Sequence, residues 1–210
     1  MAALTVKQFV VGPVGTNCYF AINQATKEMF IVDPGAEAEK LIAQIDQLKV
    51  TPVAVLLTHG HFDHAGAVEK MAAHYQIPVY AGENEKGTLE SATKNLSGPM
   101  MGQPEVYHAT DYLKDMEEHT IAGMKVRTLF TPGHTEGGVC YYLPNEMVVF
   151  SGDTLFCESV GRTDFPGGSA STLIRSIQEK LMPLPDFIKV YPGHNAMTTI
   201  GNERGYNPYL

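Results

Sequence analysis

The sequence has few of the features that mark secreted or membrane proteins. It holds only three cysteines, Cys18, Cys140 and Cys157, an odd number without close spacing. A disulfide framework is therefore not expected, and a reducing cytoplasm is the expected location. No apolar run approaches the roughly 18 residues that a membrane span requires. The N-terminus also lacks a basic start followed by a long apolar stretch, so no secretory signal is predicted.

Positive charge is also scarce. Fifteen Lys and Arg residues oppose 23 Asp and Glu residues, for a net charge of −8, and no block of basic residues occurs. An acidic chain of this kind is a poor candidate for electrostatic binding to nucleic acid or to an anionic membrane, so neither partner is expected. The composition is globular, with 44% hydrophobic and 18% charged residues over 210 positions. That length suits one large domain or two small ones.

Short apolar runs separated by turn residues predict a chain rich in strands. The expected strands cover residues 4–11, 18–23, 29–32, 52–57, 78–80, 120–124, 125–130, 138–143, 147–150 and 187–191. Helical spacing predicts helices after the turn at 33–35, over 65–75, and over 169–182 with Ser169 or Ser171 as N-cap. Residues 83–108 are interpreted as a partly helical surface excursion. Because hairpins and strand–helix units both occur, two packed sheets with helices outside, an α/β (α+β) fold, are favoured over a doubly wound sheet.

Imidazole and carboxylate side chains follow four of these predicted strands directly. The candidates are His59, His61, Asp63 and His64 after 52–57, His134 after 125–130, Asp153 after 147–150, and His194 after 187–191. Strand ends on one edge of a sheet converge in space, so these seven side chains should meet. The other histidines, His74, His108 and His119, stand alone and are expected to be bystanders.

Seven ligands are too many for one tetrahedral zinc but suit two metal ions. Three imidazoles would bind one ion, two imidazoles and a carboxylate the other, and a second carboxylate would be shared. Nitrogen and oxygen ligands without thiolate suit zinc, manganese or iron. Two ions about 3.5 Å apart can hold a bridging hydroxide and clamp a hydrolytic transition state.

The four ligand clusters, the stretch PVGTNCY at 13–19 and the turn VDPG at 32–35 resemble the metallo-β-lactamase superfamily over essentially the whole chain. The loop GRTDFPGG at 161–168 is typical of its short glyoxalase II-like (hydroxyacylglutathione hydrolase-like) hydrolases and of the related sulfur dioxygenases. The resemblance implies a four-layer αβ/βα sandwich of two mixed sheets flanked by helices. It also implies that 1–210 form a single domain, without the C-terminal helical glutathione-binding domain of full-length hydroxyacylglutathione hydrolases.

The resemblance further implies a distribution of the ligands. One metal would take His59, His61 and His134, and the other Asp63, His64 and His194, with Asp153 bridging. Zinc is the expected metal at both positions, with iron or manganese as alternatives. Zinc-dependent β-lactamases usually carry a cysteine near the role of Asp153 and are exported, so antibiotic hydrolysis is not expected.

The implied activity is hydrolysis of a small-molecule thioester, such as the 2-hydroxyacyl conjugate S-lactoylglutathione. The metal-bridging hydroxide would be the nucleophile. Asp63 would mainly be a metal ligand, and it could also accept a proton from the metal-bound water. Arg162 would contact substrate or instead pair with Asp164 or Asp33. Asp33 would support a ligating imidazole or simply form a turn. The alternative activity is that of a mononuclear iron persulfide dioxygenase, with His59, His134 and Asp153 holding the iron. The acyl group, the thiol carrier and the oligomeric state do not follow from the sequence.

Overall fold

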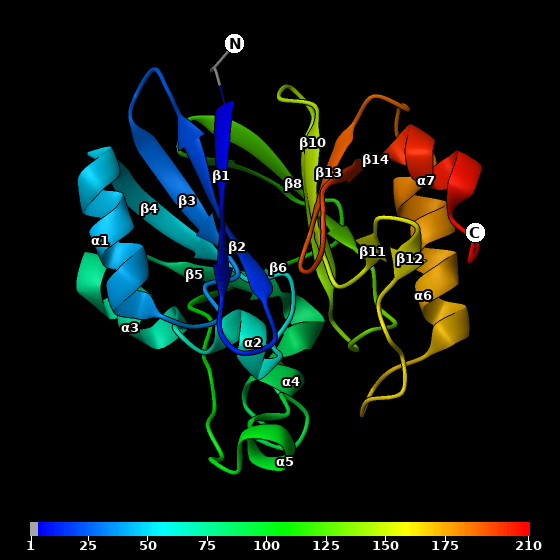
Figure 1. Cartoon of the computed structure of the whole chain (residues 1–210), viewed down its shortest axis with the longest axis horizontal. Helices are drawn as coiled ribbons and strands as arrows, with labels where there is room; N and C mark the ends of the chain where they lie inside the picture. The colour runs from blue at the N-terminus through cyan, green and yellow to red at the C-terminus, as the bar shows by residue number, and fades with distance from the viewer. Residues whose placement is uncertain (1–3) are drawn as a thin grey trace.

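Two six-stranded mixed sheets face each other in the computed structural model, which describes residues 4–210 (Figure 1). The first sheet has the order β1-β2-β3-β4-β5-β6, and the second has the order β14-β13-β10-β9-β8-β7. The strands of the first are β1 (Leu4–Val11), β2 (Thr16–Asn23), β3 (Glu28–Val32), β4 (Thr51–Leu56), β5 (Val79–Gly82) and β6 (Asp111–Leu113). Those of the second are β7 (Glu118–Ile121), β8 (Met124–Phe130), β9 (Val139–Leu143), β10 (Val148–Gly152), β13 (Lys189–Pro192) and β14 (Thr198–Thr199). A small hairpin of β11 (Leu155–Phe156) and β12 (Ser159–Val160) follows β10.

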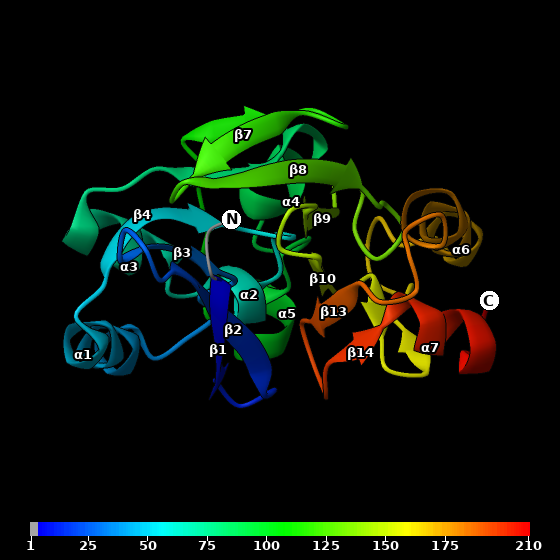
Figure 2. The same ribbon diagram turned by 90° about the horizontal axis from the view of Figure 1, so that it is seen from above.

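Helices cover the outer face of each sheet (Figure 2). The first sheet is covered by α1 (Ala38–Leu48) and α3 (Val68–Tyr75). The second is covered by α6 (Ala170–Ser176), its π-helical continuation η2 (Ile177–Leu181), and α7 (Ile200–Tyr206). The short helices α2 (Phe62–Ala65), α4 (Lys86–Leu89) and α5 (Ser97–Met101) gather at one end of the sandwich in Figure 1. A 3₁₀ turn, η1 (Glu83–Glu85), leads directly into α4. The expected four-layer sandwich of two mixed sheets flanked by helices is confirmed.

Burial on both faces explains the unbroken apolar runs of the sequence. In β2, Phe20 and Ile22 pack toward the helices, whereas Tyr19 and Ala21 pack toward the other sheet. Successive strand residues point to opposite faces, so a strand buried on both sides needs apolar residues at every position. Between the sheets, Tyr19 lies with its ring centroid 5.5 Å from that of Phe150 in β10.

The predicted strands agree with the observed ones to within about three residues, but two other predictions need correction. The helix expected over 65–75 is two helices, α2 and α3, because the backbone leaves helical geometry at Ala67, which has φ of −103° and ψ of 2°. Segment 83–108 is partly helical as expected, yet Glu85, Leu89 and Asn95 are buried, so it is not wholly a surface excursion. Helix α7, capped by Thr199, lies in a tail where no strong pattern is visible.

The strand directions place the ligand segments at one end of the sandwich. Strand β10 runs parallel to β13 and antiparallel to β9, which is antiparallel to β8. The carboxyl ends of β8, β10 and β13 therefore lie at the same edge of the second sheet. Strand β4 of the facing sheet leads into residues 58–64. Among residues 4–210, no helix has the length and apolarity needed to cross a bilayer.

Candidate metal centre

The seven predicted side chains converge at this end of the sandwich. Their ligand atoms fall into three overlapping groups, and within each group the atoms lie within 4.8 Å of one another. The groups are His59, His61 and His134; His59, His64 and Asp153; and Asp63, His64 and His194. The three histidines expected to be bystanders belong to none of these groups.

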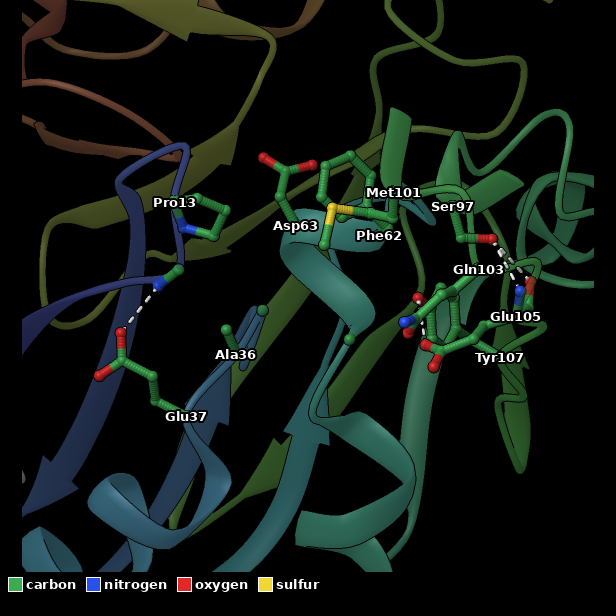
Figure 3. Close-up of a pocket in the computed structure, with 13 residues that line it drawn as sticks. Pro13, Ala36, Glu37, Phe62, Asp63, Ser97, Met101, Gln103, Glu105 and Tyr107 are labelled. Atoms are coloured by element: carbon green, nitrogen blue, oxygen red, sulfur yellow. Dashed lines mark hydrogen bonds between the residues drawn. The ribbon is translucent and has the colours of Figure 1, made fainter. Parts of the chain in front are cut away.

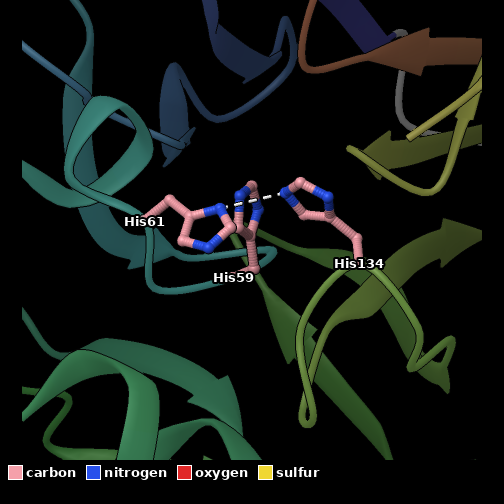
Figure 4. A group of neighbouring side chains, drawn as sticks. All are labelled: His59, His61 and His134. Carbon is pink, nitrogen blue, oxygen red and sulfur yellow. Dashed lines mark hydrogen bonds between the residues drawn. The ribbon is translucent and has the colours of Figure 1, made fainter. Parts of the chain in front are cut away.

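Figure 4 shows three of the imidazoles turned toward one another. His59 and His61 come from the loop after β4, and His134 from the loop after β8. The Nδ1 of His61 lies 2.9 Å from the Nε2 of His134. Two strand ends, one from each sheet, thus contribute these three imidazoles, which explains why His134 is far from His59 and His61 in sequence.

Two carboxylates lie between the remaining imidazoles. The Nε2 of His64 lies 3.5 Å from an Asp63 oxygen and 3.4 Å from Oδ1 of Asp153. The Nε2 of His194 lies 3.3 Å from Oδ2 of Asp63 and 3.5 Å from Oδ2 of Asp153. Asp153 also approaches His134, at 3.5 Å. Asp153 therefore faces histidines of both proposed ligand sets, which is the position a shared ligand needs.

Asp33 orients two of the imidazoles from behind. Its Oδ2 accepts hydrogen bonds from the Nδ1 of His64 (3.0 Å) and from the hydroxyl of Thr58 (2.6 Å). The Thr58 oxygen in turn lies 3.2 Å from the Nδ1 of His59. Because both rings are held through Nδ1, each presents Nε2 to the cluster. Asp33 therefore holds two imidazoles of the candidate cluster as well as forming a turn, and carboxylates beside metal sites commonly act in this way.

A backbone carbonyl fixes the third imidazole. The Nδ1 of His134 donates to the carbonyl oxygen of Arg162 at 2.6 Å. A neutral ring that donates through Nδ1 keeps the lone pair of Nε2, which here points into the cluster.

Several buried polar atoms of the cluster have no protein partner. Within residues 4–210, the Nε2 atoms of His59, His61 and His64 and the Oδ1 of Asp153 are buried without a hydrogen bond. Buried polar atoms are normally satisfied, and exceptions need an explanation. Divalent cations would provide the missing partners, so this donor set fits metal ions.

The hairpin of β1 and β2 anchors the second half of the cluster. The hydroxyl of Thr16 donates to Oδ2 of Asp63 at 2.9 Å. The side-chain amide of Asn17 donates to the carbonyl oxygens of Pro192 (2.9 Å) and Asn195 (3.0 Å), on either side of His194. At Gly193, a Cβ atom would lie 2.2 Å from Oδ1 of Asp153, so only glycine allows this close approach.

The electrostatic environment favours neutral imidazoles and ionised carboxylates in part of the cluster. Burial lowers the pKa of His59 well below its usual value, and burial together with His134 lowers the pKa of His61 to about 3. Burial alone would raise the pKa of Asp153, but His64 and the neighbouring histidines lower it to about 2. Metal ligands must be deprotonated, so these groups are already in the form that a cation binds.

The neighbouring carboxylates favour the protonated form of the two other imidazoles in the cluster. Burial would lower the pKa of His64, but Asp63, Asp153 and Asp33 raise it well above its usual value. Burial would likewise lower the pKa of His194, but Asp63 and Asp153 raise it. For Asp63, burial is outweighed by His64 and His194, which hold its pKa below the usual range.

Arg162 forms the ion pair with Asp164 that was one of its predicted roles. Its guanidinium donates to both carboxylate oxygens, at 2.8 and 2.7 Å, and lies 4.0 Å from the ring centroid of Phe165. Phe165 in turn packs edge-on against His61. Arg162 also lines the cavity above the ligands. Contact with a substrate stays a prediction.

Two cavities adjoin the cluster and share Phe62 and Asp63. The one over the ligands has a volume of about 330 Å³. Its apolar walls are formed by Val14, Phe62, Leu96, Met100, Phe156, Val160 and Phe165. The other, of about 290 Å³, has acidic walls with Glu37, Asp63 and Glu105 (Figure 3).

Sequence reasoning assigned no role to several residues that shape the site. Thr16 lies in the quoted stretch 13–19, but its contact with Asp63 spans 47 positions. Phe165 lies in the glycine-rich loop without a local signal for its contact with His61. Glu85, which bonds the backbone between His59 and His61, gives no signal in a segment without clear periodicity.

The comparison with protein families agrees with this geometry. Residues 11–194 match the Lactamase_B family, described as the Metallo-beta-lactamase superfamily. The chain belongs to the metallo-beta-lactamase superfamily. With its candidate His and Asp ligands, it is a metal-dependent hydrolase of that superfamily.

Relatives and solved structures align along most of the chain. The probable metallo-hydrolase YqgX of Bacillus subtilis (strain 168) is 41% identical over 97% of this chain and 96% of its own. The hydroxyacylglutathione hydrolase GloC of Haemophilus influenzae is 38% identical over 88% of each chain. The crystal structure of BLEG-1 B3 metallo-beta-lactamase is 42% identical with a TM-score of 0.93, covering 98% and 99% of the two chains. That of TTHA1623 in a di-iron-bound form is 35% identical with a TM-score of 0.84, covering 97% and 100%.

Proposed function

We propose that this protein hydrolyses a small-molecule thioester, with S-lactoylglutathione as the representative substrate, at a centre of two divalent cations. The observation that carries the proposal is the convergence of seven nitrogen and oxygen ligands beneath an apolar-walled cavity. The name of the relative GloC supports the thioester, and the di-iron form of TTHA1623 supports two metal positions.

The proposed ligand sets follow the groups of converging atoms. One cation takes His59, His61 and His134, and the other takes Asp63, His64 and His194. Asp153 is the shared ligand, supported by its approach to His64, His134 and His194. Zinc suits these imidazole and carboxylate ligands, as do iron and manganese.

The cations would supply a water of lowered pKa and a Lewis acid for the thioester carbonyl. The chain's own contribution is to hold Asp63 beside that position. The Thr16 hydroxyl donates a hydrogen bond to Oδ2 of Asp63, and this bond keeps the carboxylate turned toward His64 and His194. Asp63 can accept a proton there. A thiol, with a pKa near 8.5, leaves without a strong acid, so no dedicated acid is required.

The cavity walls are consistent with a small acyl thioester. A volume of about 330 Å³ lies at the small end of the range for small-molecule sites, about 300–1,000 Å³. Apolar walls limit water at the reacting carbonyl. Arg162 at the cavity wall is proposed to contact a substrate carboxylate or carbonyl. Its replacement by alanine is then expected to raise KM with little change in kcat, since the carbonyl that holds His134 belongs to the backbone.

The test combines metal analysis with hydrolysis of S-lactoylglutathione. We expect two divalent cations per chain and loss of activity on chelation. Asp153→Asn should lower kcat by at least about 100-fold, because losing even an outer partner of a metal ligand costs about 10- to 100-fold. His108→Asn is the matched control, since His108 pairs with Glu69 on the surface. Full thioesterase activity after complete metal removal would contradict the proposal.

Hydrolysis of β-lactams is a second candidate, because the neighbour at 42% identity is named a B3 metallo-beta-lactamase. The same preparation is assayed with nitrocefin, and a kcat/KM far above that for S-lactoylglutathione would favour this activity instead. One iron per chain with persulfide-dependent oxygen uptake would favour the dioxygenase alternative.

A further inference from the structure

Glu85 is a fully buried carboxylate that none of the proposed catalytic steps uses. It ends η1, has no exposed surface, and forms no ion pair with any residue from 4 to 210. Its Oε1 accepts a hydrogen bond from the backbone amide of Gly60 at 2.7 Å. Its Oε2 accepts from the hydroxyl of Thr135 and the backbone amide of Gly137, both at 2.9 Å.

These partners belong to two ligand loops from opposite sheets. Gly60 lies between His59 and His61, after β4 of the first sheet. Thr135 directly follows His134, after β8 of the second sheet. One carboxylate therefore ties together the loops that carry all three ligands of one proposed cation.

The backbones meet closely at this point as well. A Cβ atom on Gly137 would lie 2.2 Å from the backbone nitrogen of Glu85, so glycine allows the His134 loop to lie directly against η1. The His134 loop thus packs directly against η1 and cannot move away from it without breaking the hydrogen bonds of Thr135 and Gly137 to Glu85.

Burying this carboxylate is unfavourable in itself. Burial raises the pKa of Glu85 to about 7, while the hydrogen bonds from Gly60, Thr135 and Gly137 oppose the rise. Buried groups with perturbed pKa values concentrate at functional sites. The position of Glu85 between two ligand loops supplies a functional reason for retaining it.

We propose that Glu85 is a positioning residue that sets the spacing between the His59–His61 turn and the His134 loop, and thereby the affinity of that cation site. The inference rests on the proposed two-cation centre. A glutamine cannot replace the carboxylate, because each oxygen receives a backbone N–H. A side-chain NH₂ would face one of these donors and leave it unpaired.

The experiment measures zinc transfer from the zinc-loaded protein to a chromophoric chelator. The wild-type protein should release two zinc ions in two resolved steps. Variants His134→Ala and His194→Ala assign the steps, since each removes a ligand of one proposed cation only. Glu85→Gln should weaken the step assigned to His134 by about 10- to 100-fold and leave the other step unchanged.

Glu203→Gln is the matched control. Glu203 is also fully buried, and its oxygens accept hydrogen bonds from Glu158, Thr198, Asn202 and Asn207, none of them in a ligand loop. Its replacement should lower the melting temperature to a similar extent as Glu85→Gln but retain both zinc steps. Equal weakening of zinc binding by the two variants would show that Glu85 acts only through general stability and would overturn the inference.

A milder variant covers the case in which Glu85→Gln does not fold. Thr135→Val removes one hydrogen bond to Glu85 but, unlike Glu85→Gln, places no side-chain NH₂ group opposite a backbone N–H. It should weaken the same zinc step by a smaller factor. Unchanged zinc steps in Thr135→Val and in folded Glu85→Gln overturn the role of Glu85 while the metal centre stands. Wild-type protein without two zinc steps overturns the centre itself.

Discussion

Asp33 shows how much one residue can do in this site. Its backbone lies in the left-handed region, with φ of 50°. From there its carboxylate reaches the backbone amide of Thr58 (2.8 Å), the hydroxyl of Thr58, and His64. Through Thr58 it also reaches His59, so one carboxylate orients an imidazole of each proposed cation site.

Asp33→Asn should weaken zinc binding at both sites by about 10- to 100-fold. Asparagine tolerates left-handed backbone, so the turn is retained, but its amide nitrogen cannot accept the bonds that the second oxygen accepts. Chelator competition on the zinc-loaded protein measures the change. Asp46→Asn on the exposed side of α1 is the control, and equal zinc affinity in the two variants would contradict this role for Asp33.

At the scale of the element, the ends of strands and helices decide where the ligands lie. Strands β4, β8, β10 and β13 each end immediately before a ligand segment, while α2 carries Asp63 and His64. On the outer side of the second sheet, α6 begins directly after Ser169, whose side-chain oxygen accepts from the amide of Thr172 at 3.4 Å. Of the two N-caps predicted, Ser169 is therefore the one observed.

Ser169→Ala should lower the free energy of unfolding by about 1 kcal/mol, the usual cost of losing an N-cap. Ser171→Ala, one position inside the exposed first turn, should change it by less than about 0.5 kcal/mol. Urea unfolding of the zinc-loaded proteins measures both values, and zinc content should stay the same. A larger loss for Ser171→Ala would reverse the assignment of the cap.

At the scale of the whole molecule, metal binding and proton binding compete. The chain carries a formal charge of −8, and two divalent cations would offset part of it. Carboxylates raise the pKa values of His64 and His194 above the usual histidine value, against the effect of burial. The attraction between these protonated imidazoles and the carboxylates stabilises the metal-free fold at low pH. This stabilisation is lost as the pH rises through the raised pKa values of the two histidines. Zinc must displace the same protons, so its affinity rises with pH.

The gain in melting temperature on adding zinc should therefore be larger at pH 8 than at pH 6. Ligand binding to the folded state alone raises stability by RT ln(1 + [L]/Kd), so a lower Kd at pH 8 gives a larger shift. Thermal unfolding at both pH values, with and without excess zinc, measures it. An equal or smaller shift at pH 8 would show that these histidines do not release protons on binding.

Much of the fold follows from local patterns because both sheets are buried on two faces. The apolar runs of β2, β4 and β10 are visible in the sequence, and turn residues separate them. Helix α7 and the break between α2 and α3 are not visible in this way, because short helices depend more on packing than on periodicity. No local sequence pattern indicates that Glu85 contacts the loops that carry His59, His61 and His134.

The sequence by itself determined the layers of the fold and the seven candidate ligands, because burial periodicity and the position of a residue after a strand are local properties. Only the tertiary structure decided which side chains hold those ligands in place. Thr16, Asp33, Glu85 and the Arg162 carbonyl each form such a contact across 28 to 50 positions. Such contacts depend on how the two sheets pack. That packing brings distant segments together, and no residue spacing in the sequence predicts it.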